Sequence, residues 1–137
     1  MRKQLNTIVE LTEHLVEGAS NELQIYVLDL PGAGNANHYY EISGFNTNTN
    51  PSCQFSNGNS GLDIYFQNGT IPEKGVNGVT IESLLAVCAD RLRSFQAGPF
   101  ACDDNQDALD NISNAIKFLQ KRTRSRIARQ VEGKEIV

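Results

Sequence analysis

The feature that most constrains this chain is a pair of amphipathic helix patterns in its C-terminal half, separated by a Gly-Pro break. Apolar residues recur at spacings of three and four on both sides of Gly98-Pro99, which is the pattern of helices with one apolar face. The two stripes consist of Ile81, Leu84, Leu85, Cys88, Leu92 and Phe95, and of Leu109, Ile112, Ala115, Ile116 and Leu119. The sequence therefore predicts a long helical hairpin over residues 80–133.

Capping signals define the ends of both predicted helices. Thr80 is a suitable N-cap for the first helix, with Glu82 in its first turn. Asp103 or Asp104 starts the second helix, and its basic far end suits the negative pole of the helix dipole. Gly133 is expected to close it.

The N-terminal half favours β-structure. Apolar or alternating segments that end in turn residues predict strands at Leu23–Leu30, His38–Phe45 and Leu62–Asn68. Residues 46–61 and 69–79 predict loops. Leu5–Gly18 has apolar residues at mixed spacing, which fits either a short amphipathic helix or a strand, and we favour the helix. The expected fold is α+β: a small antiparallel sheet of about three or four strands, then the two-helix hairpin. The length predicts a single domain over residues 1–137, with residues 1–79 mainly β.

Charge is distributed unevenly along the chain. Residues 1–89 contain three bases and nine acids, whereas residues 90–137 contain nine bases and seven acids. Seven of the twelve bases lie between Lys117 and Lys134. This pattern indicates a local anion site, and the acidic sequence pI of about 5.1 argues against a surface for long nucleic acid.

Several function classes find little support. The three cysteines form no CxxC pair, which indicates reduced thiols in a cytosolic protein and neither a disulfide framework nor a zinc site. We expect no signal peptide, no membrane span and no cofactor. His14 and His38 are the only histidines and belong to no metal or triad motif, so an enzyme is disfavoured.

Four residues of the hairpin suit the recognition of a nucleotide diphosphate. Arg122 and Arg126 lie one helical turn apart, and two guanidinium groups on one face can each bind phosphate oxygens bidentately. Phe95 is able to stack on a base, and Asn105 to pair with the edge of an adenine. Arg122 follows Asn105 by 17 residues, or roughly 25 Å of helix. We therefore expect a shared pocket only between two antiparallel protomers.

Each of these residues also has a structural interpretation, which the pattern alone favours. Phe95 is then the last core residue of its helix, Asn105 bonds to local amides, and the basic run is a solvated face. Similarly, Gly75–Thr80 is more typical of a turn than of a phosphate loop. Several aspartates at the start of the second helix could bind a divalent cation, but complementing the helix dipole explains them equally well. They are Asp103, Asp104, Asp107 and Asp110.

Ordered motifs from Phe66 to the C-terminus resemble the first described phage family of Thoeris anti-defense sponges. The motifs are FQNG and GVNGVT, then DRL-x-x-FQ, Cys-x-x-Asn, R-T-x-x-R and a final VEG. The resemblance implies a non-enzymatic protein that binds glycocyclic ADP-ribose in the host bacterial cytoplasm and thereby blocks Thoeris defence. It also implies a homo-oligomer built of dimers, expected to be a hexamer. By motif position, the ligand residues are Phe95, Asn105, Arg122 and Arg126.

Other readings stay open at this point. The family also resembles sponges that hold cyclic trinucleotides at a separate site, and the hairpin resembles the second anti-CBASS sponge family, which captures cyclic dinucleotides. Relatives carry Cys-Arg-Glu-Asn where this chain has Cys102-Asp103-Asp104-Asn105, a difference that bears on ligand preference. An enzyme that degrades such messengers and a protein that docks an acidic partner are the alternatives from other classes.

Overall fold

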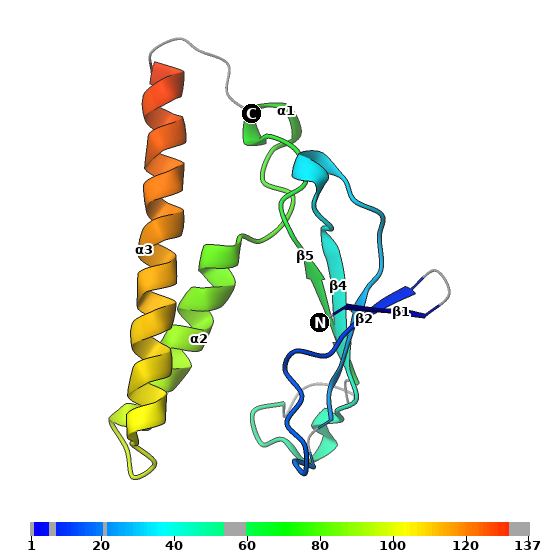
Figure 1. Ribbon diagram of the computed structural model, residues 1–137, viewed down its shortest axis with the longest axis vertical. Helices are drawn as coiled ribbons and strands as arrows, with labels where there is room; N and C mark the ends of the chain where they lie inside the picture. The colour runs from blue at the N-terminus through cyan, green and yellow to red at the C-terminus, as the bar shows by residue number, and fades with distance from the viewer. Residues whose placement is uncertain (1, 6–7, 21, 54–59, 132–137) are drawn as a thin grey trace. The chain divides into compact units, whose positions relative to one another are not determined.

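The computed structural model describes residues 2–5, 8–20, 22–53 and 60–131. It divides into two compact units, Met1–Val79 and Thr80–Val137. The first unit is a β-sheet and the second is a pair of helices, so the predicted α+β class is confirmed (Figure 1). That the whole chain forms a single domain stays a prediction, and the two units are described separately below.

The sheet of the first unit is a five-stranded antiparallel meander in which each strand pairs with the next one along the chain. Its strands are β1 (Arg2–Leu5), β2 (Ile8–Leu11), β3 (Gln24–Val27), β4 (Tyr39–Ser43) and β5 (Gly61–Tyr65). The three strands expected from the sequence correspond to β3, β4 and β5. The sheet therefore has more strands than the three or four expected, because β1 and β2 add a hairpin at one edge.

The helix assigned to Leu5–Gly18 is wrong. Residues Ile8–Leu11 form β2, and the described part of the segment beyond them contains turns instead of a helix. Val9 pairs with Val27, and Leu11 pairs with Ile25. Val9 and Leu11 extend the apolar face of the sheet, and this burial stabilises the segment more than a single isolated turn of helix would.

The strand register gives the sheet one apolar and one polar face. Because opposed residues of antiparallel strands point to the same side, the pairing aligns the apolar side chains in two neighbouring rows. These rows are Val9, Val27, Tyr40 and Ile64, and Leu11, Ile25, Ile42 and Leu62. Val27 is the most buried of them, at 3% exposure. The opposite face carries a row of polar side chains: Glu10, Tyr26, Glu41 and Asp63.

A connector, residues 66–79, leads out of β5 and is closed by two amide side chains. Asn77 pairs with the main chain of Asn68, accepting from its N–H at 2.9 Å and donating to its carbonyl at 2.8 Å. Gln67 Nε2 donates to the carbonyl of Gly75 at 2.8 Å, and its Oε1 accepts from Asn77 N–H at 3.0 Å. The GVNGVT motif is therefore a closed turn whose main-chain N–H groups largely bond within the fold. The connector also contains the short helix α1 (Ile71–Lys74).

The second unit is a helical hairpin of α2 (Ile81–Gln96) and α3 (Asp103–Val131). Thr80 caps α2 as expected: its Oγ1 accepts from Ser83 N–H, and Ser83 Oγ accepts from Thr80 N–H, both at 3.1 Å. The predicted start of α3 is confirmed at Asp103. Gly133, the predicted helix end, lies outside the described residues. Among the described helices, none is long and apolar enough to cross a membrane.

The two helices differ greatly in length, and this leaves part of α3 without a neighbour within the hairpin. α2 has 16 residues and α3 has 29, so α3 is the longer by roughly 20 Å. Figure 1 shows α3 continuing past the start of α2. We call residues 120–131 the overhang. The most buried residues of the hairpin are Ala89, at 1% exposure in the middle of α2, and Leu109, at 9% in the second turn of α3, and both lie away from the overhang.

Candidate ligand-binding site on the helical hairpin

The turn end of the hairpin contains two of the four predicted site residues. Phe95 is the penultimate residue of α2 and is half-buried. The guanidinium carbon of Arg91, one turn earlier in the same helix, lies 5.1 Å from the centre of its ring. Phe95 is thus neither a fully buried core residue nor a bare aromatic surface, because a cation already covers part of its ring.

Asn105 lies in the first turn of α3 and is also half-buried. Its main-chain N–H donates to Cys102 Sγ at 3.4 Å, and its side-chain Nδ2 donates to the carbonyl of Phe100 at 3.4 Å. The first distance is ordinary for a sulfur acceptor, whereas the second, from nitrogen to oxygen, is near the outer limit of hydrogen bonding. Asn105 therefore forms hydrogen bonds with neighbouring residues, as expected for a residue with a purely structural role. The single bond of its side-chain amide is weak.

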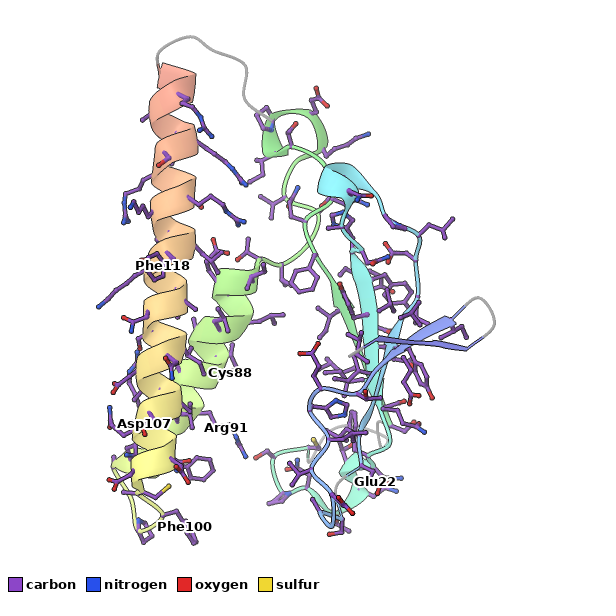
Figure 2. The ribbon with its side chains drawn as sticks, in the orientation of Figure 1. Glu22, Cys88, Arg91, Phe100, Asp107 and Phe118 are labelled. Atoms are coloured by element: carbon purple, nitrogen blue, oxygen red, sulfur yellow. The ribbon has the colours of Figure 1, made fainter. Side chains whose placement is uncertain are left out.

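The turn between the helices presents an exposed aromatic residue. Phe100 is 74% exposed, and Figure 2 shows it at the tip of the hairpin. Gly98 N–H donates to the carbonyl of Phe95 at 3.1 Å, which closes the end of α2. Gln96 joins this end to the start of α3, through hydrogen bonds to both main-chain groups of Cys102.

Arg122 and Arg126 lie on the overhang of α3, and both are exposed. Within the described residues, neither guanidinium is paired with a carboxylate, so both charges are available to an anion. Phe118 lies four residues before Arg122, and Arg129 lies three residues after Arg126. Both are therefore close to the same side of α3, because residues three or four positions apart in a helix share a face. Phe118 is 71% exposed and stands out from α3 in Figure 2. The overhang thus presents several cations to solvent, and an exposed aromatic residue lies just before it.

The hairpin brings together Phe95 and Asn105 but not the two arginines. The 17 residues from Asn105 to Arg122 lie within the uninterrupted helix α3, which corresponds to roughly 25 Å along its axis. No bend intervenes that would shorten this distance within one chain. A ligand of dinucleotide size therefore contacts only one of the two groups in a single protomer.

The acidic and metal-ligating side chains of the described residues do not cluster. No group of three or more His, Cys, Asp and Glu side chains among them is arranged to hold a metal ion. The aspartates at the start of α3 are exposed, and Asp110 accepts a hydrogen bond from Gln106 at 2.9 Å. What this part of the chain supplies is an aromatic ring, an amide and an exposed cationic helix, which are the components of a nucleotide-binding surface.

Comparison with known proteins finds a family that resembles this part of the chain. Residues 58–124 match the family described as Acb2/Tad1, hairpin domain. This segment of the chain is therefore similar to an Acb2/Tad1 hairpin domain. The match begins before β5 and ends within the overhang, so it covers Phe95, Asn105 and Arg122, whereas Arg126 lies two residues beyond it.

A curated relative supports the same assignment. The chain is 41% identical over 70 residues to the protein named Thoeris anti-defense 1 of Bacillus phage SBSphiJ7. The aligned part covers 51% of this chain and 49% of the relative, so the chain spans about half the length of the curated relative that it matches. The resemblance to the phage sponge family, first noted from separated motifs, is confirmed at the level of the hairpin domain.

Two residues of the turn end were not selected from the sequence. Arg91 and Gln96 both belong to the DRL-x-x-FQ motif, and the spacing of four between Arg91 and Phe95 is a signal for a contact on one helix face. The role of Gln96 had no such signal, because its partner Cys102 lies across a turn whose path depends on the folded hairpin.

Proposed function

We propose that this protein is a non-catalytic phage sponge that binds and sequesters cyclic ADP-ribose-type immune messengers, with glycocyclic ADP-ribose as the preferred class, and thereby blocks Thoeris defence. The observation that carries the proposal is the match to the Acb2/Tad1 hairpin domain, together with two exposed arginines one turn apart on α3 that pair with no carboxylate of the described residues. The similarity to Thoeris anti-defense 1 of a phage supports the same role. The site of action is then the cytoplasm of the bacterial host, where such messengers act.

The proposed roles follow from the chemistry of the four site residues. Arg122 and Arg126 clamp the diphosphate, because each guanidinium fork binds two oxygens and both lie on one helix face. Phe95 stacks on the adenine, and Asn105 forms hydrogen bonds to the ligand. None of the four acts as a nucleophile or as a general base in this scheme, so the messenger is held without being cleaved.

The working unit is a pair of hairpins that lie head to tail. The roughly 25 Å between the turn end and the arginines prevents one chain from surrounding one ligand. Antiparallel pairing brings the turn end of one protomer to the overhang of its partner, and twofold symmetry then creates two equal pockets. Ile127, 53% exposed, continues the apolar stripe of α3 into the overhang, which supports the burial of this face by another copy. Three such dimers would form the proposed hexamer.

A second candidate is a sponge for cyclic dinucleotides or trinucleotides. It is favoured by the family match itself, which covers both Acb2 and Tad1 hairpins. Cyclic oligonucleotides present the same phosphates to an arginine pair. We propose that cyclic trinucleotides would bind at a second site, separate from the four site residues of the hairpin, and we assign no residues to it.

Calorimetry of the purified protein against glycocyclic ADP-ribose, cyclic dinucleotides and cyclic trinucleotides tests both candidates. The first predicts saturable heat with glycocyclic ADP-ribose, at one ligand per protomer. Heat only with the oligonucleotides would favour the second candidate. No heat with any of them would leave the alternative of an acidic protein partner for the basic helix.

A release experiment separates sequestration from degradation. The messenger is incubated with the protein, the protein is then denatured by heat, and the supernatant is analysed by liquid chromatography and mass spectrometry. A sponge returns the messenger intact and in full amount. Linear or hydrolysed products would instead identify an enzyme.

A further inference from the structure

The side chain of Gln96, the last residue of α2, spans the turn of the hairpin. Its Oε1 accepts a hydrogen bond from the N–H of Cys102 at 3.0 Å, and its Nε2 donates to the carbonyl of Cys102 at 3.1 Å. Nε2 also lies 3.4 Å from Gln106 Oε1. A primary amide that offers one acceptor and two donors satisfies both main-chain groups of a single residue in this way. Gln96 thereby holds the residue that immediately precedes α3.

Cys102 in turn organises the first turn of α3. Its carbonyl accepts the N–H of Gln106 at 3.2 Å, and its Sγ accepts the N–H of Asn105 at 3.4 Å. The second bond satisfies one of the donors that the start of a helix leaves without an intrahelical partner. The position of Asn105 therefore depends on Cys102, and the position of Cys102 depends on Gln96.

The other hydrogen bonds of the turn, among the described residues, either stay within the turn or are long. Gly98 N–H bonds back to Phe95, and Ala101 N–H bonds to Gly98 at 3.4 Å, so neither reaches α3. The side chain of Asn105 reaches only Phe100, also at 3.4 Å. The two bonds from Gln96 to Cys102, at 3.0 and 3.1 Å, are thus the best-formed link between the end of α2 and the start of α3.

We infer that Gln96 is a positioning residue for ligand recognition, which fixes Asn105 relative to Phe95 without contacting the ligand itself. Both ends of its carboxamide are engaged by Cys102, and its Nε2 also lies 3.4 Å from Gln106 Oε1, so the polar groups of Gln96 are directed at the start of α3. The inference rests on the proposed function, because it requires Asn105 to bind the messenger. It assigns a function to the glutamine of the DRL-x-x-FQ motif, next to the stacking residue.

The test is a double-mutant cycle between Gln96→Met and Asn105→Ala, measured by calorimetry with glycocyclic ADP-ribose. Methionine keeps the length and volume of the side chain but lacks both polar groups, which limits damage to the fold. We expect Gln96→Met to weaken binding about three- to tenfold in the wild-type background, in line with the loss of one or two hydrogen bonds, and less than about twofold when Asn105 is already alanine. An equal loss in both backgrounds, or no loss in either, overturns the inference.

Amide hydrogen exchange followed by NMR provides a readout that does not need the ligand. Gln96→Met should accelerate exchange at Cys102 and Asn105, while Ile116 in the middle of α3 keeps its protection. Gln120→Met, a matched change at an exposed glutamine of α3, should leave all three amides unchanged. Unchanged exchange at Cys102, in a protein that binds the messenger normally, overturns the inference alone. Absence of heat from the wild-type protein overturns the proposed function and the ligand role of Asn105 with it.

Discussion

Arg91 holds its guanidinium carbon 5.1 Å above the ring centre of Phe95, one helical turn further along α2. This contact places a cation beside the ring that we propose as the stacking platform for adenine. Exposed contacts of this kind stabilise a fold by about 0.5–1 kcal/mol. A base that reaches the covered side of the ring must displace Arg91 or stack against its guanidinium plane.

The Arg91–Phe95 contact predicts a modest and specific loss of stability. Arg91→Gln should lower the free energy of unfolding by about 0.5–1 kcal/mol in urea denaturation. Arg93→Gln is the matched control, since it removes the same charge from the last turns of α2 where the structure describes no ring contact. Equal losses for the two variants would attribute the effect to helix-end charge alone.

The arginine pair predicts a strong and face-specific loss of binding. Arg122→Ala and Arg126→Ala should each weaken binding of glycocyclic ADP-ribose by about 1.5–3 kcal/mol, the range for hydrogen bonds to charged groups. Arg124→Ala removes the same charge from a nearly opposite side of α3 and should change affinity far less. Calorimetry on the three variants decides this, and binding that survives the double change of Arg122 and Arg126 contradicts the phosphate clamp.

A pocket shared between protomers predicts complementation. One variant carries Phe95→Ala and Asn105→Ala, and the other carries Arg122→Ala and Arg126→Ala; neither should bind alone. After the two are unfolded and refolded together in equal amounts, random pairing gives mixed dimers with one intact pocket, so about a quarter of the pockets should recover. Calorimetry measures that fraction as the number of binding sites. A mixture that stays inactive while mixed dimers are present would contradict a pocket shared between protomers.

Gly78 predicts a large stability effect in the connector. A Cβ at this position would lie 2.4 Å from the carbonyl carbon of Phe66 and 2.6 Å from the nitrogen of Gln67, both main-chain atoms that cannot easily move. Gly78→Ala should therefore lower the free energy of unfolding by about 1–3 kcal/mol, the usual range for overpacking. Gly61→Ala is the control, because its Cβ would meet its nearest atoms at an ordinary 3.9 Å. Thermal melting of both variants compares them directly.

Tyr39 predicts a loss of stability at alkaline pH. A hydrogen bond with Tyr65, then desolvation, then the hydrogen bond and charge of Asp63 raise the pKa of Tyr39 above its ordinary value near 10. The folded chain therefore keeps this proton longer than the unfolded chain does, so the stabilisation is complete below about pH 10 and declines as the pH rises above it. Urea denaturation across this range should show the decline, and Tyr39→Phe should remove its share of the slope. A slope that is unchanged in Tyr39→Phe would contradict this origin.

The helical hairpin could be predicted from the sequence because helix signals are local. The spacing of Ile81 to Phe95, the cap at Thr80 and the break at Gly98-Pro99 each act within a few residues, and the structure confirms all three. The segment around β2 could not be predicted in this way. Val9 pairs with Val27, which lies 18 positions away in the sequence. Pairing with this distant strand outweighs the weak local preference of the segment for a helix.

The sequence by itself determined the residue types of the candidate site and the distance between its two halves. The rise of an uninterrupted helix makes Asn105 and Arg122 too distant for one small ligand, whatever the rest of the fold. Only the tertiary structure revealed that Gln96 spans the turn to Cys102 through two hydrogen bonds. The physical reason is that these contacts depend on the path of a short turn and on side-chain rotamers, and those are settled by packing between the helices.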